Sequence, residues 1–128
     1  MGYENYRHYT PQQEKHLEMQ SRANGTHRGD PIKHEALSDK STVIVRVKNL
    51  PSGGTLTVRV YDSADYNHAY WNLAEEFTVD ATNLADPLST GKECYHESIG
   101  HPMGPWIMVE VVVANGPIEF NVDVVTGL

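Results

Sequence analysis

The sequence predicts an all-β protein, an antiparallel β-sandwich or jelly-roll-like barrel of five to seven strands, preceded by an extended N-terminal arm. Three observations support this prediction. Apolar and polar residues alternate over residues 42–62 and again over 106–125. Clusters of Gly, Pro and Asn separate the alternating runs, and no helical pattern appears after residue 41. A period of two is typical of strands that bury one face.

The first alternating region consists of two runs separated by a turn cluster. The runs are "TVIVRVKN" and "TLTVRVYD", and the turn between them is "LPSGG". Two alternating runs joined by a five-residue turn predict a β-hairpin over residues 42–62. Its inward side chains would be Val43, Val45, Val47, Leu56, Val58 and Val60.

The C-terminal region repeats this plan. "WIMVEVVVA" is a strongly β-prone run, "NGP" is a turn signal, and "IEFNVDVV" alternates again. A second hairpin is therefore predicted, and the two hairpins would supply most of the core. Weaker strands are expected around "EEFTVDAT" and "KECYHESI". The inward residues of the last run would be Ile118, Phe120, Val122 and Val124.

Residues 1–41 are predicted to form an extended arm, separate from a β-sandwich domain over residues 42–128. Thr10 is a good N-cap, Pro11 suits the first helical position, and Asn24 begins a stop signal. These signals predict a helix over about residues 11–23. The helix has too few apolar side chains to be stable without an external surface. The arm also holds four histidines, which could sense pH, although most surface histidines have no such role: His8, His16, His27 and His34.

The charge distribution limits the classes of partner. Residues 1–41 hold six basic and six acidic side chains, whereas residues 42–128 hold four basic and eleven acidic ones and so carry the net charge of −7. Phosphate binding needs clustered Lys and Arg, so nucleic acid is not an expected partner. No apolar run is long enough to cross a membrane, no signal peptide is expected, and the single Cys94 fits a reducing cytoplasm.

The segment "CYHESIGHPM" contains the ligand types of a blue-copper site. Its spacing does not fit that family, and zinc binding through Cys94, His96 and His101 has no recognised spacing either. A polar connection whose cysteine packs as a small hydrophobe is the preferred interpretation. We therefore expect neither metal nor cofactor and keep these three residues as a weak candidate.

An aromatic segment, "YDSADYNHAYWNLAEE", is the second candidate site. Its rings lie among carboxylates and amides, which suits a packed loop or a protein interface first and a sugar platform second. The candidate residues are Tyr61, Tyr66, Tyr70 and Trp71.

No arrangement of catalytic groups is evident. Glu75 and Glu76 are adjacent, so on a strand they point to opposite faces and cannot act as an acid–base pair. The sequence has no glycine-rich phosphate loop and no nucleophile elbow. The prediction is therefore that the protein is not an enzyme.

A small acidic β-domain with a long arm resembles the capsid cement, or decoration, proteins of tailed bacteriophages. This resemblance implies a virion protein made in the host cytoplasm, which binds the capsid exterior as a dimer or trimer and cements neighbouring subunits of the major capsid protein. Self-association would use Tyr61, Val113 and Val125. The capsid-binding anchors would be Tyr3, Tyr6, Arg7, Tyr9, Leu17, Met19, Arg22 and Arg28.

A different class of function remains open. The chain could be a carbohydrate-binding module, or a tail or adhesion domain, that recognises glycans through Tyr66, Tyr70 and Trp71. Both interpretations predict a binding protein without an active site.

Overall fold

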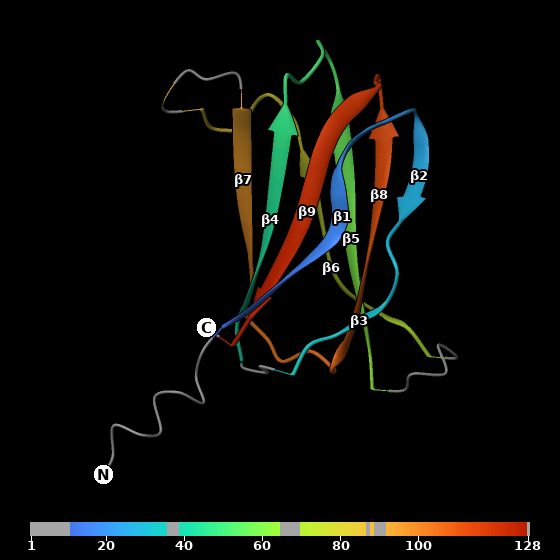
Figure 1. Cartoon of the computed structure of the whole chain (residues 1–128), viewed down its shortest axis with the longest axis vertical. Helices are drawn as coiled ribbons and strands as arrows, with labels where there is room; N and C mark the ends of the chain where they lie inside the picture. Colours follow the sequence, from blue (N-terminus) through green and yellow to red (C-terminus); the bar gives the residue numbers. More distant parts are fainter. Residues whose placement is uncertain (1–10, 36–38, 65–69, 87, 89–91, 128) are drawn as a thin grey trace.

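The computed structural model describes residues 11–35, 39–64, 70–86, 88 and 92–127, and within them it contains nine strands and no helix (Figure 1). The described part therefore holds no helix that is long and apolar enough to span a membrane. The strands are β1 (Gln12–Arg22), β2 (Gly25–Arg28), β3 (Ile32–Lys33), β4 (Ser41–Lys48), β5 (Thr55–Ser63), β6 (Asn72–Val79), β7 (Lys92–Ile99), β8 (Trp106–Ala114) and β9 (Ile118–Thr126).

The strands form two antiparallel sheets packed face to face, as Figure 1 shows. Sheet A has the order β1-β9-β4-β7, and sheet B has the order β2-β8-β5-β6, with β3 also paired to β8. The pairs β1–β9, β2–β8, β4–β7 and β5–β6 make one long antiparallel ribbon that is rolled into two layers. This arrangement is a jelly roll. The predicted sandwich is confirmed, although it has more strands than expected.

The core lies between the two sheets and is built mainly from valine. The predicted inward residues of β4, β5 and β9 are all buried, which confirms the alternation that was used to assign their faces. β8 contributes Ile107, Val109, Val111 and Val113 to the same layer. The predicted role of Val113 in self-association is therefore wrong, because this side chain packs inside the protein.

The two predicted hairpins are wrong, although their strands are correct. β4 belongs to sheet A and β5 to sheet B, so the "LPSGG" loop crosses between the sheets instead of closing a hairpin. β8 and β9 are divided between the sheets in the same way, across a turn that contains the cis peptide Gly116–Pro117. Alternation identifies which face of a strand is buried. It does not identify the neighbouring strand, and a short loop can serve either connection.

The predicted N-terminal helix is also wrong. Residues 12–22 form β1, which pairs along β9, and residues 25–33 form β2 and β3, which pair along β8. The expected separation of an arm from the domain is therefore not seen in residues 11–35. Helix propensity is a weak preference, and backbone pairing with a partly formed sheet outweighs it here.

Two irregularities in β1 explain why its sequence does not look like a strand. The register shifts between Lys15 and Leu17, so that His16 and Leu17 are both buried. It shifts again between Leu17 and Gln20, which leaves Met19 unpaired and 42% exposed. Such β-bulges break the alternation of inward and outward residues.

Gly29 lies where the outer edges of the two sheets meet. Its amide donates a hydrogen bond of 2.9 Å to the carbonyl oxygen of Val109, which extends the pairing of β2 with β8. A Cβ atom at this position would clash with the main-chain carbonyl of His16 in β1. Glycine therefore permits the close approach of the two N-terminal segments.

Replacing Gly29 with alanine should lower the free energy of unfolding by about 1–3 kcal/mol, the usual cost of overpacking. The added methyl group would meet main-chain atoms, which cannot rotate away. Gly100→Ala is the matched control, because a Cβ atom there meets nothing within 4 Å. Urea denaturation followed by tryptophan fluorescence measures both variants. Equal stability of the two would contradict the proposed contact.

Candidate functional site

Several residues assigned to a capsid-binding arm instead hold β1 in place. Leu17 is buried in the core opposite Val122. The Arg22 guanidinium donates a hydrogen bond of 3.1 Å to the carbonyl oxygen of Phe120 and lies 4.9 Å from the centre of its ring. The anchors Tyr3, Tyr6, Arg7 and Tyr9 lie outside the described residues.

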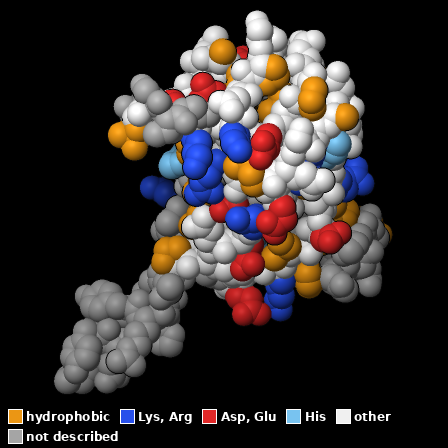
Figure 2. Space-filling view, turned by 45° about the horizontal axis from the view of Figure 1, so that its top comes forward, with side chains coloured by type: hydrophobic (Ala, Val, Ile, Leu, Met, Phe, Trp, Pro, Cys, Tyr) orange, Lys and Arg blue, Asp and Glu red, His pale blue; other side chains and the backbone are white. Residues whose placement is uncertain are grey.

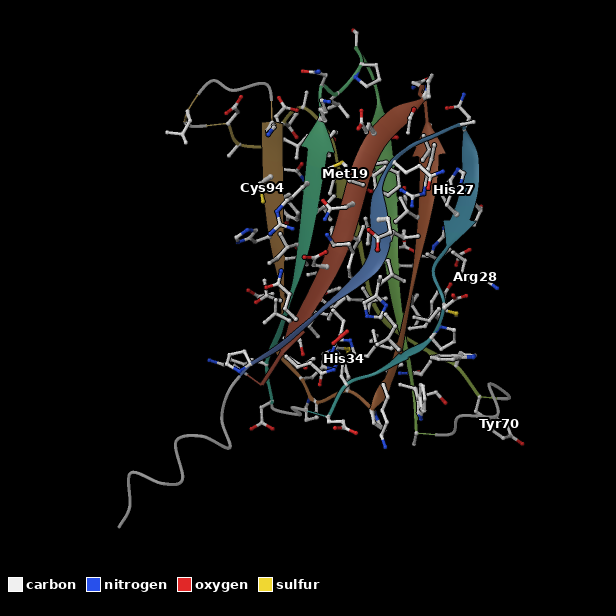
Figure 3. The ribbon with its side chains drawn as sticks, viewed as in Figure 1. Met19, His27, Arg28, His34, Tyr70 and Cys94 are labelled. Atoms are coloured by element: carbon white, nitrogen blue, oxygen red, sulfur yellow. The ribbon has the colours of Figure 1, made fainter. Side chains whose placement is uncertain are left out.

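Met19 borders a hollow on the outer face of sheet A. The hollow has a volume of about 390 Å³ and reaches across β9 and β4 to Cys94 on β7. Figure 3 labels Met19 and Cys94. Figure 2 shows Lys and Arg side chains gathered on this side of the molecule, with carboxylates beside them. Because Arg46 is paired with Asp123 at 3.2 Å and Lys48 lies opposite Glu119, no single charge dominates the hollow.

The weak metal candidate does not converge in space. Cys94 and His96 both lie on the outer face of sheet A, where they are opposite Arg46 and Ile44 of β4. His101 follows β7, and its Nε2 lies 3.1 Å from the carbonyl oxygen of Ala74 in sheet B. Burial raises the pKa of the Cys94 thiol, which disfavours the thiolate that metals bind. Within the described ranges, no group of three His, Cys, Asp or Glu residues is placed to hold a metal ion.

The outer face of sheet B carries a charged ladder that crosses all four main strands. Arg28 of β2 and Arg59 of β5 both lie opposite Glu110 of β8, and Arg59 also lies opposite Glu76 of β6. Arg28 Nη2 lies 3.5 Å from Glu110 Oε1, and Arg59 Nε donates to Glu76 Oε2 at 2.7 Å. The charges alternate along the row, so each one has an opposite neighbour.

Glu110 is the buried centre of this ladder. It is only 7% exposed, although its side chain points to the outer face. Burial, followed by a hydrogen bond to Glu110, raises the pKa of Tyr61 above its ordinary value. The carboxylate is thus held by groups on both sides, and its position on the face is well defined.

A strip with aromatic rings lies directly below the ladder. Tyr61 lies opposite Met108 on one side and Leu73 on the other. Trp106 is two residues from Met108 along β8, so it shares the outer face and is a diagonal neighbour of Tyr61. Trp106 and Glu110 were missed from the sequence. The alternation of "WIMVEVVVA" places them opposite the buried valines and could have identified them.

The predicted aromatic loop leads into this same end of sheet B. Tyr66 lies outside the described residues, Tyr70 is 77% exposed at the lower end of the molecule, and Trp71 directly precedes β6 (Figure 3). Asp62 fixes this end of the sheet, because it accepts hydrogen bonds from Asn72 Nδ2 at 3.2 Å and from the Gly104 amide at 2.6 Å.

Glu110→Gln should lower the free energy of unfolding by about 1–3 kcal/mol, since it leaves two arginines beside a buried site that has lost its charge. Glu76→Gln is the matched control at the solvent-exposed end of the same ladder, where the loss should be below about 1 kcal/mol. Thermal and urea denaturation of both variants test this order. An equal loss of stability in both variants would show that the burial of Glu110 does not increase its contribution to stability.

Comparison with known proteins identifies the fold but no family. No family model and no curated protein matches the sequence. Among solved structures, the chain is similar to a non-crystalline cellulose specific carbohydrate-binding module, CBM28, with a TM-score of 0.51 and 10% identity over 90% of this chain and 70% of that one. It is also similar to dimeric latent PorU from Porphyromonas gingivalis, with a TM-score of 0.43 and 11% identity, over 91% of this chain but only 12% of that one.

Proposed function

We propose that the protein is a non-catalytic carbohydrate-binding domain that holds a glycan on the outer face of sheet B. The observation that carries this proposal is the aromatic strip of Tyr61 and Trp106 beside the charged ladder centred on Glu110. Aromatic faces offer apolar area to the C–H face of a sugar ring, while fixed polar groups bind its hydroxyls. Binding sites commonly combine an apolar surface with a few well-placed polar groups.

The spacing of these groups suits a chain of sugars. Tyr61 and Trp106 are diagonal neighbours on adjacent strands, a relation that places their Cα atoms about 7–8 Å apart. The ladder lies on one side of this strip, and beyond it a further row provides the hydroxyls of Thr26, Thr57 and Thr78. A glycan lying along the strands would therefore meet rings first and polar groups next.

The charge of the ladder favours a neutral glycan. Two arginines and two glutamates alternate, so the row has no net charge to attract an acidic or basic sugar. The similarity to a cellulose-specific module shows the fold alone, but it makes soluble glucans the first ligands to test.

The capsid-cement interpretation remains a second proposal with weaker support. It depended on a free arm, whereas residues 12–33 form strands of both sheets in this chain. Its predicted self-association surface is also divided. Tyr61 lies on the outer face of sheet B, Val125 lies on the outer face of sheet A, and Val113 is buried.

Tyr61→Ala should weaken glycan binding about tenfold or more, equivalent to about 1.4 kcal/mol, because one stacking surface is lost. Affinity electrophoresis against soluble cellulose derivatives, xylan and starch identifies a ligand, and calorimetry then measures its affinity. Ile44→Ala, which removes an apolar side chain from the outer face of sheet A, is the control and should bind normally.

Trp106→Ala should show the same loss as Tyr61→Ala if the two rings form one platform. A folded wild-type protein that binds none of these polysaccharides would contradict the proposed function. Equal binding by the Tyr61 and Ile44 variants would instead place the glycan on another surface.

A further inference from the structure

Two histidines of the N-terminal segment form a buried pair. His16 lies at the first bulge of β1, and His34 follows β3 near the lower end of the sandwich (Figure 3). Their Nε2 atoms are 2.9 Å apart, and the two side chains are only 5% and 0% exposed. The ring planes differ by 8° with centroids 5.2 Å apart, so the two nitrogens face each other. The interpretation of these residues as surface histidines is wrong.

This geometry allows one proton between the rings. One Nε2 must donate and the other must accept, so the two histidines cannot both be protonated while the pair is hydrogen-bonded. His34 Nδ1 has a second partner in Thr126 Oγ1 at 3.1 Å. His16 Nδ1 is buried and has no hydrogen-bond partner among the described residues. A proton added at His16 Nδ1 would therefore introduce a buried charge with no acceptor among the described residues.

The charged groups near the pair are already engaged with other residues. Asp123 of β9, which faces His16, accepts from Gln13 at 2.7 Å and is paired with Arg46 at 3.2 Å. Glu14 of β1, which faces His34, accepts from Gln12 at 3.2 Å.

Among the described residues, the remaining neighbours are mostly uncharged or already paired. From the loop before β8, the carbonyl of Pro105 accepts from the His34 amide at 2.7 Å, and β9 adds the Thr126 hydroxyl. Lys15 lies opposite Asp123. Lys33 and Glu35, beside His34, form an exposed pair at 4.0 Å.

The direction of the pKa shifts agrees with this geometry. Burial, and then the charge of His34, lowers the pKa of His16 from 6.5 to about 3, and burial lowers the pKa of His34. As the pH falls, the two histidines therefore bind protons at a higher pH in the unfolded segment than in the folded one. The pair stabilises the fold fully above about pH 6.5 and loses this contribution as the pH falls towards about 3.

We propose that His16 and His34 form an acid-sensitive clasp that holds the outer edges of the two sheets together and opens before the rest of the sandwich unfolds. The clasp joins β1 of sheet A to the segment beside β3 of sheet B, at the edge where Gly29 approaches β1. Opening this edge leaves β9 paired with β4 and β8 paired with β5, so most of the valine core stays covered. This proposal does not depend on glycan binding.

Hydrogen exchange of the whole protein at about pH 7.5 and about pH 5, corrected for intrinsic rates, tests the clasp. A histidine that is neutral in the closed edge and titrates freely in the open edge raises the equilibrium constant for opening up to about 30-fold at pH 5. Two such histidines raise it up to about 1000-fold. Peptides from residues 12–22 and 31–35 should show this increase. Peptides from residues 43–47 and 56–60 should stay protected.

His34→Gln keeps a hydrogen-bonding side chain but removes one titrating group, so its acid-induced increase should fall to about 30-fold. His27→Gln is the matched control in the same segment, since His27 Nε2 bonds to the carbonyl of Ala23 at the surface, away from the pair, and it should behave as wild type. An equal pH response in all three proteins, or simultaneous exchange in the core peptides, would overturn the proposal.

Titration of the wild-type histidines by NMR gives a second test that needs no variant. His16 and His34 should remain neutral at pH values well below 6.5, the ordinary pKa of a histidine side chain. A titration of either residue near pH 6.5, with the N-terminal strands still protected from exchange, would show that the pair is not a clasp.

Discussion

The pairing of residues 12–33 with β9 and β8 is the constraint that covers one edge of each sheet and brings His16 and His34 together. β8 and β9 each contribute four side chains to the core, more than any other strand, and without β1, β2 and β3 each would be an unprotected sheet edge. The two added edges come close enough to touch only because position 29 is glycine and because the histidine rings fit between them. Covering both edges with one continuous segment also joins the two sheets on this side.

Sequence reasoning was accurate where one face of a strand alone decides the structure. The inward valines of β4 and β5 and the limits of β7 could be predicted, because burial of one face imposes a period of two. Strand partners could not be predicted in this way, since alternation is the same in a hairpin and in a connection between sheets. The N-terminal strands were missed because their pairing energy comes from another part of the chain, while local signals such as Pro11 favoured a helix.

The candidate site shows the same division. Tyr61 could be found from composition, but its neighbours Trp106 and Glu110 are distant in the sequence and meet it only through the register of β5 with β8. The charged ladder forms only because the register of four strands places their charged residues opposite one another. Such alignment is a property of the sheet and is not encoded in any single strand. Composition therefore favoured a glycan platform on the loop, whereas the platform that we propose from the register lies on the sheet.

The two proposals meet at β8. Lys33 of β3 pairs with Trp106, and the neighbouring His34 amide bonds to Pro105, the residue before β8. A clasp that opens at low pH would remove the strand beside Trp106 and so change one side of the proposed glycan platform. Coupling of this kind is reciprocal. A glycan that binds better to the closed edge must also stabilise that edge against opening, by the same coupling free energy. The edge would then open at a lower pH, and both sites would respond to one equilibrium.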